Sequence, residues 1–131
     1  MKAVLDTNVL VRHLTADPPE QAKRATAFLA DAEELLLSDI VVAELVYALD
    51  TVYRVERARI AELLRAVIAF PAIVVLDEAL LLRALELYEQ EKLDFVTSYL
   101  AASAERSGVG AVASFYRSLE RIESVQLVEP R

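Results

Sequence analysis

The sequence has no cysteine, no tryptophan, two glycines and a single histidine among its 131 residues. Without cysteine, neither a disulfide framework nor a thiolate metal site can form. The one histidine, His13, is expected to be a surface residue and not a catalytic base. The chain also has no glycine-rich phosphate loop. Any chemistry must therefore come from carboxylates, hydroxyls and amides.

No apolar run approaches the roughly 18 residues of a membrane span, and Asp6 comes too soon after the start for a signal peptide. We therefore expect a cytoplasmic protein without a membrane segment. The net charge of −7 argues against a broad nucleic-acid surface, because Lys and Arg bind phosphate backbones. A local basic rim around an acidic, metal-loaded cleft remains compatible with this charge, and so does a basic protein partner.

What the chain does contain is a hydrophobic content of 56%, enough for one packed domain over residues 1–131. Strand-like and helix-like segments alternate, which is typical of βα units around a parallel sheet. The predicted fold is a three-layer α/β/α sandwich. The predicted strands are 2–5, 35–37, 73–76, 110–113 and, at a sheet edge, 125–128.

Helices are predicted between these strands from local start and stop signals. Pro18-Pro19 precedes a one-sided apolar stripe, and Asp77 and Asp94 are possible N-caps of two later helices. Gly108 should end the second of these. A further apolar stripe runs from Ile60 to Val67.

Polar residues follow several predicted strands, where sites form in open parallel sheets. Asp6 follows the first strand, Ser38-Asp39 the second and Ser114 the fourth. The triplet Asp6-Thr7-Asn8 lies between apolar segments. It is either the start of a functional site or simply a cap for the next helix.

Glu44 is the one charged residue among the ten from Ile40 to Leu49. A helix this apolar should be buried on most sides, so we expect Glu44 in or beside the core, with a partner. That partner is either an arginine, Arg12 or Arg54, or a divalent cation shared with Asp6. Mg²⁺ takes oxygen ligands and needs only one or two protein carboxylates.

Four segments together resemble the PIN domain, specifically the VapC-like toxins of type II toxin-antitoxin pairs. The first two hold Asp6 and Glu44, and the last two lie near the end of the chain. The segments are 5–10, 37–45, 93–102 and 112–119. Their order and spacing match the family's four motifs over nearly the whole chain.

The resemblance implies an endoribonuclease that uses Mg²⁺ or Mn²⁺ to activate a water against an RNA phosphodiester. It also implies a sheet with strand order 3-2-1-4-5, a homodimer and an antitoxin encoded alongside. Asp6 and Glu44 match the family's first two acidic positions. Asp94 matches a frequent aspartate just ahead of the third position. The resemblance thus assigns these three residues as metal ligands and catalytic residues.

The chain departs from the family at the remaining acidic positions, which are Thr97, Tyr116 and Ser118. Asp94, three residues before Thr97, could share its helix face and lean into the cleft, or could serve only as an N-cap. Thr97 or Asn8 could hold a water on the metal. Tyr116 is expected to pack against a neighbouring helix, with stacking on a base or blocking the metal cleft as alternatives.

Two other functions stay open. One is a catalytically degenerate PIN domain that binds protein or RNA, favoured by the missing acids. The other is a purely structural α/β domain in which Asp6 and Glu44 are paired with arginines. For the homodimer, the segments Ile40–Leu49 and Ile60–Ile68 are the predicted contact faces.

Overall fold

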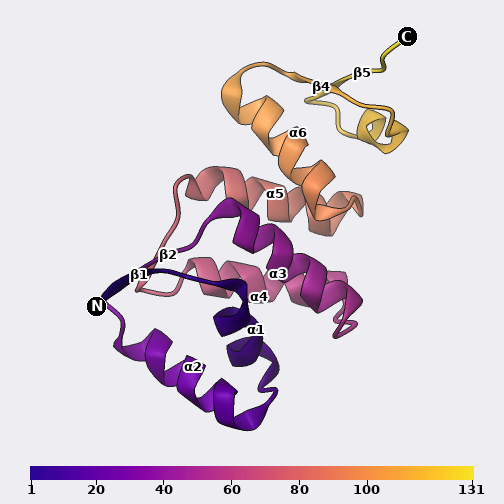
Figure 1. Ribbon diagram of the computed structural model, residues 1–131. Helices are drawn as coiled ribbons and strands as arrows, with labels where there is room; N and C mark the ends of the chain where they lie inside the picture. Colours follow the sequence, from indigo (N-terminus) through magenta and orange to yellow (C-terminus); the bar gives the residue numbers. More distant parts are fainter. The chain divides into compact units, whose positions relative to one another are not determined.

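The computed structural model describes residues 1–131, and the chain divides into two compact units, Met1–Leu76 and Asp77–Arg131. Each of the first three strands is followed by a pair of helices along the chain, which runs from the indigo N-terminus to the yellow C-terminus in Figure 1. All strand pairs are parallel. The predicted α/β class is therefore confirmed.

The first unit contains three short strands with β2 in the middle. They are β1 (Lys2–Val4), β2 (Glu34–Leu36) and β3 (Ile73–Val74). Ala3 pairs with Leu35, which in turn pairs with Ile73. Leu35 and Leu37 are completely buried, so the residues at and just after β2 form part of the core.

Four helices complete the first unit: α1 (Thr7–Thr15), α2 (Pro19–Asp31), α3 (Asp39–Thr51) and α4 (Arg57–Ile68). Helix α2 begins at Pro19, as the proline pair predicts. Helix α1 packs against α2 and α3, and α3 packs against α4. The β1 end and the start of α1 are therefore placed beside α3.

The second unit consists of α5 (Glu78–Glu91), α6 (Phe95–Ser107), β4 (Ala111–Ala113), the 3₁₀ helix η1 (Arg117–Arg121) and β5 (Gln126–Val128). The predicted caps are confirmed. Asp77 Oδ1 accepts from the Leu80 N–H at 3.1 Å, and Gly108 ends α6 with a φ of +80°. Tyr88 and Phe95 meet edge to face across the α5–α6 contact. Helix η1 was not predicted.

The strand neighbours β1-β2-β3 and β4-β5 agree with the two ends of the predicted order 3-2-1-4-5. The pairing of the first strand with the fourth stays a prediction, as does a single domain over 1–131. None of the helices has the length and apolar content that a membrane crossing requires.

The burial of α4 argues against the prediction that the Ile60–Ile68 segment is a dimer contact face. Ile60, Ala61 and Leu64 are fully buried within the first unit, and Val67 and Ile68 nearly so. The apolar stripe of α4 faces this unit's own core. It leaves little apolar surface on the 60–68 segment for a second copy.

Candidate functional site

Asp6 lies at the junction between β1 and α1. The preceding Leu5 is 2% exposed, which anchors the junction in the core, while Asp6 itself is exposed. Asp6 Oδ1 accepts from the Thr7 N–H at 2.8 Å and caps α1. The capping alternative is therefore correct, but it uses only one of the two carboxylate oxygens. The other has no protein partner.

Glu44 comes from α3 and is joined to the start of α1 by a hydrogen bond. Thr7 Oγ1 donates to Glu44 Oε1 at 3.4 Å, across 37 residues of sequence. Thr7 directly follows Asp6, so the packing of α1 on α3 places Glu44 next to the residue that follows Asp6. The two predicted acids thus lie in one small region of the first unit.

Neither predicted arginine pairs with these acids. Arg12 Nε donates to Gln21 Oε1 at 2.8 Å, and Arg54 makes no ion pair. Neither Asp6 nor Glu44 is in a salt bridge. This argues against the purely structural interpretation, in which each carboxylate is neutralised by a guanidinium.

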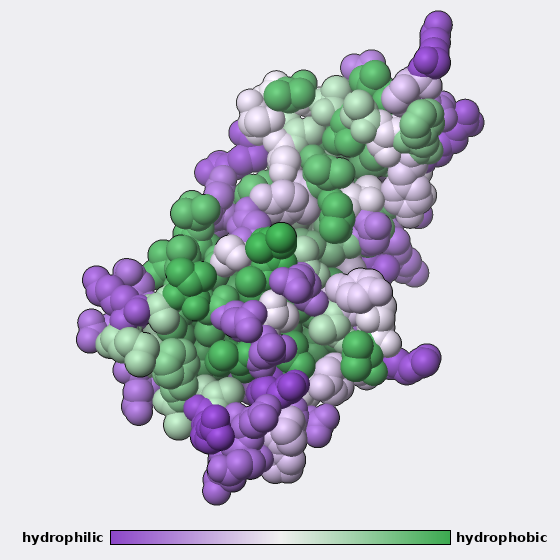
Figure 2. Space-filling model, viewed as in Figure 1, coloured by the Kyte–Doolittle hydropathy of each residue, from purple (hydrophilic) through white to green (hydrophobic).

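The prediction that Glu44 lies in or beside the core is wrong. Its side chain is exposed, as are Ile40 (71%) and Tyr47 (69%) on the same face of α3. The core-facing residues are instead Val41, Val42, Leu45, Val46 and Leu49. Figure 2 shows hydrophobic and hydrophilic residues side by side on the visible face where α3 lies. Because apolar residues occur on both faces, composition could not locate the buried one.

Asp94 belongs to the second unit, where it is the N-cap of α6. Its Oδ1 accepts from the Thr97 N–H at 2.7 Å, and Ser98 Oγ donates to its backbone carbonyl at 2.9 Å. Asp94 is exposed, whereas Thr97 is 9% exposed. The capping interpretation is confirmed. A role of Asp94 beside Asp6 and Glu44 stays a prediction.

The fourth-motif positions lie around the start of η1. Ser114 Oγ accepts from the Tyr116 N–H at 2.9 Å, which holds the turn between β4 and η1. Tyr116 is 44% exposed, and its packing against a neighbouring helix stays a prediction. Ser118 is within η1 and Tyr116 is its N-cap, so neither family position carries a carboxylate.

The second unit has an ion-pair network that sequence reasoning missed. Arg83 on α5 reaches Glu105 on α6 through Nε (2.8 Å) and Nη2 (3.0 Å), and also contacts Glu86. Ser124 donates to the same Glu105 carboxylate. The Arg83 guanidinium lowers the pKa of Glu105, and burial only partly opposes this. The i,i+3 spacing of Arg83 and Glu86 was the only local signal.

A second pair in this unit joins Asp77 to Arg106. Arg106 Nε lies 3.0 Å from Asp77 Oδ2, and this hydrogen bond, with that from the Leu80 N–H, lowers the pKa of Asp77. Asp77 and Glu105 are therefore engaged in structural pairs. They are poor candidates for metal ligands.

The donor set of the first unit fits one hard cation. No cluster of three or more His, Asp or Glu side chains capable of holding a metal is present. Asp6 and Glu44 nevertheless supply two carboxylates, with the Thr7 hydroxyl between their helices and no competing arginine. A hydrated Mg²⁺ or Mn²⁺ requires no more protein ligands than these two. A second metal ion has no ligands here.

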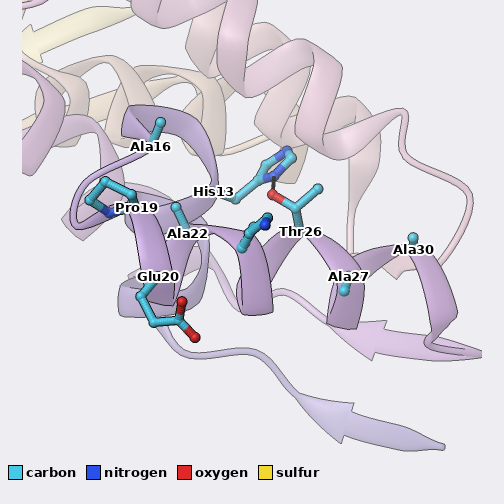
Figure 3. Close-up of a pocket in the computed structure, with 9 residues that line it drawn as sticks. His13, Ala16, Pro19, Glu20, Ala22, Thr26, Ala27 and Ala30 are labelled. Atoms are coloured by element: carbon cyan, nitrogen blue, oxygen red, sulfur yellow. Dashed lines mark hydrogen bonds between the residues drawn. The ribbon is translucent and has the colours of Figure 1, made fainter.

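Two grooves run along the contact of α1 and α2. One, of about 750 Å³, is lined by alanines, Pro19, Glu20 and His13, whose Nδ1 lies 2.8 Å from Thr26 Oγ1. Figure 3 shows this groove, with the His13–Thr26 contact inside it. It holds one carboxylate, and neither Asp6 nor Glu44 lines it. The other groove, of about 480 Å³, contains Asn8, two residues after Asp6.

The comparison with protein families identifies the class. The model of the PIN domain matches residues 3–124, which spans both units. The chain therefore belongs to the PIN domain family, and the resemblance drawn from the four motifs is confirmed. Among curated proteins, none matches the chain.

Two solved structures are similar to the chain along nearly its whole length. One is VapBC2 from Rickettsia felis bound to a DNA fragment from its promoter, with 19% identity, a TM-score of 0.38 and 98% of each chain covered. The other is FitAB bound to an IR36 DNA fragment, with 21% identity and a TM-score of 0.40. The match with FitAB covers 99% of this chain and 95% of the FitAB chain.

Proposed function

We propose that this protein is a Mg²⁺- or Mn²⁺-dependent endoribonuclease, the toxin of a toxin-antitoxin pair acting in the cytoplasm. Asp6 and Glu44 hold the metal, and Asp94 is an auxiliary acid. PIN domains are generally metal-dependent nucleases, and family membership is the background of the proposal. The observation that carries it is the hydrogen bond from Thr7, the residue after Asp6, to Glu44, while neither acid is in a salt bridge.

The residues have separate tasks in this mechanism. Asp6 caps α1 with Oδ1 and keeps Oδ2 for an ion, so the cap fixes the carboxylate that binds. Thr7 orients Glu44 through its hydroxyl. A bound divalent cation supplies an activated water and stabilises charge on the scissile phosphate. With only two firm carboxylates, one metal ion is expected.

The test is metal binding and RNA cleavage in conservative variants. Asp6→Asn keeps an N-cap of equal quality and removes the charge, and Glu44→Gln keeps an acceptor for Thr7. We expect Mn²⁺ affinity by calorimetry to fall at least about tenfold in each, and cleavage of a structured RNA to fall roughly a hundredfold. Asp50→Asn, on the exposed side of α3, is the matched control and should change neither. Unchanged cleavage in both acid variants rejects the assignment.

A degenerate PIN domain acting as a binding module is the second candidate. It is favoured by Thr97, Tyr116 and Ser118 at positions that are acidic in the family. If this candidate holds, the natural protein has no metal affinity and the double variant Thr97→Asp/Tyr116→Asp acquires it. Metal-dependent cleavage by the natural protein excludes this candidate.

The proposed antitoxin is a protein with a basic segment, since the chain carries a net charge of −7. Co-expression with the adjacent reading frame should yield a complex that elutes together from a sizing column and has no cleavage activity. Separate elution of the two products, with cleavage undiminished, contradicts this part of the proposal.

A further inference from the structure

The groove next to the start of α1 has the composition of a nucleic-acid site. It is lined by Asn8, Val9 and Arg12 of α1 and by Gln21, Arg24, Ala25 and Phe28 of α2, and is named here the arginine groove. Its volume of about 480 Å³ is within the range of small-ligand sites. Asn8 is two residues after Asp6, so the groove begins in the first turn of the helix that Asp6 caps.

Both arginines of this groove are free of carboxylates. Arg12 donates through Nε to Gln21, which fixes the guanidinium and leaves its terminal N–H groups available. Arg24 is exposed and makes no ion pair. By contrast, Arg83, Arg106 and Arg117 each pair with an acid. In a chain of net charge −7, two unpaired arginines in one groove form a local positive site.

The remaining groups of the groove favour a nucleotide over a simple anion. Phe28 is half-buried, so part of its ring lines the groove. An aromatic ring beside arginines is the combination that binds single strands, because bases stack on the ring while phosphates contact the guanidinium groups. The amides of Asn8 and Gln21 add hydrogen-bonding capacity at the same place.

We propose that the arginine groove binds one nucleotide of a single-stranded RNA beside the metal site, with Arg12 and Arg24 on phosphates and Phe28 stacked on the base. The choice of RNA as the ligand rests on the proposed function. The groove then positions the strand so that the neighbouring phosphodiester reaches the carboxylates. Arg12 and Arg24 are positioning residues in this assignment.

The test measures binding without cleavage. The full-length protein is titrated into a fluorescently labelled 12-nucleotide single-stranded RNA in EDTA, with anisotropy as the readout, at several salt concentrations. Arg12→Gln and Arg24→Gln should each weaken binding about three- to tenfold and reduce the salt slope by about 0.7. Phe28→Leu should weaken it about tenfold, and Phe28→Tyr should restore it.

Lys23→Gln is the matched control. Lys23 is the residue before Arg24 on α2, but it lines the other groove, the one shown in Figure 3. The Lys23→Gln substitution removes one positive charge, as Arg24→Gln does, and should leave RNA affinity within about twofold of that of the natural protein. Equal losses for Lys23→Gln and Arg24→Gln mean that only overall charge matters and overturn the proposal. A polyglutamate peptide that competes as well as RNA also overturns it, because the groove then takes an acidic protein segment.

This experiment is independent of the nuclease proposal. Calorimetry with Mn²⁺ should give the same affinity for Arg12→Gln as for the natural protein, since Arg12 contacts neither carboxylate. Loss of RNA binding with intact metal binding supports the arginine groove. Absence of metal binding and cleavage in the natural protein, with RNA affinity still sensitive to Arg12 and Phe28, refutes the nuclease and leaves the groove in place.

Discussion

Asp6 and Thr7 are adjacent residues with different tasks at the start of α1. Asp6 caps the helix and Thr7 reaches across to Glu44. Both residues have short side chains and directly follow Leu5, which is buried in the core. The proposed metal site therefore depends on a hydroxyl that is not itself acidic.

Replacing Thr7 tests this dependence. Thr7→Val is close in shape but cannot donate to Glu44, so we expect Mn²⁺ affinity to fall about two- to fivefold with no change in charge. Thr7→Ser keeps the hydroxyl and should stay near the natural value. Calorimetry of the three proteins checks the ordering, and a Val variant that binds as tightly as the natural protein contradicts a role for Thr7.

Asp94 can be tested for its two possible tasks separately. Asp94→Ala removes the cap of α6 and should lower the free energy of unfolding by about 1 kcal/mol in urea. Asp94→Asn keeps the cap, so stability should hold. If Asp94 also assists at the metal site, Asp94→Asn lowers cleavage at unchanged stability. If it is only a cap, cleavage is unaffected and the assignment of Asp94 as an auxiliary acid fails.

Helices α5 and α6 owe part of their contact to the bidentate pair of Arg83 with Glu105. Such fork geometry is the stronger form of an ion pair, and the Glu105 side chain is only 20% exposed. The pKa of Glu105 lies below its usual value of 4.5 in the folded chain because Arg83 stabilises the charged form. The pair therefore stabilises the folded state at every pH at which Glu105 is ionised.

The sign of the pH dependence follows from this lowered pKa. The stabilisation is complete above the unfolded pKa near 4.5 and is lost as the pH falls through the folded value. Glu105→Gln should cost about 1 kcal/mol at pH 7, and the difference should shrink below about pH 5 and vanish in stronger acid. Urea melts at four pH values check it. Glu62→Gln, in the exposed Arg59 pair, is the control and should cost little at any pH.

The termini of the helices also show how local signals operate. Gly108 has a φ of +80°, and a Cβ there meets no atom within 4 Å, so only the backbone conformation requires glycine. Ala16 and Lys92 end α1 and α5 in the same left-handed region without being glycine. Sequence patterns found the glycine stop and not the other two, because nothing distinguishes such residues locally.

For the chain as a whole, the number of subunits is the property most open to test. A homodimer is implied by the family resemblance, and a contact through the Ile40–Leu49 segment stays a prediction, because the exposed Ile40 and Tyr47 share the face of α3 that carries Glu44. Light scattering at micromolar concentration should give twice the mass of 14.5 kDa, and Tyr47→Glu should return the monomer. A monomeric natural protein contradicts the prediction.

The single-domain prediction can be tested by unfolding. The chain divides by contacts at Leu76, although the family match continues across that point. Fluorine-labelled tyrosines report on each part separately, Tyr53 in the first unit and Tyr88 in the second. If residues 1–131 form one domain, both signals change at the same urea concentration. Two distinct midpoints would show two domains.

Local patterns were sufficient for the strands, the α-helices and the caps at Asp77, Asp94 and Gly108, although not for the 3₁₀ helix η1. These features depend on side-chain periodicity and on hydrogen bonds between residues three or four positions apart, so a short stretch of sequence is enough to predict them. The order of the motifs was also enough to indicate the family. The chemistry of Asp6 and Glu44 as oxygen ligands follows from residue type alone.

Folding in three dimensions was needed for the rest. Which face of the apolar α3 points inward depends on what packs against it, so Glu44 proved exposed and Ile40 with it. Tertiary packing brings together residues that are distant in the chain, Thr7 with Glu44 and Arg83 with Glu105. It also leaves Arg12 and Arg24 without an acidic partner. No periodicity encodes such contacts, because they are set by how helices pack and not by the residues on one helix.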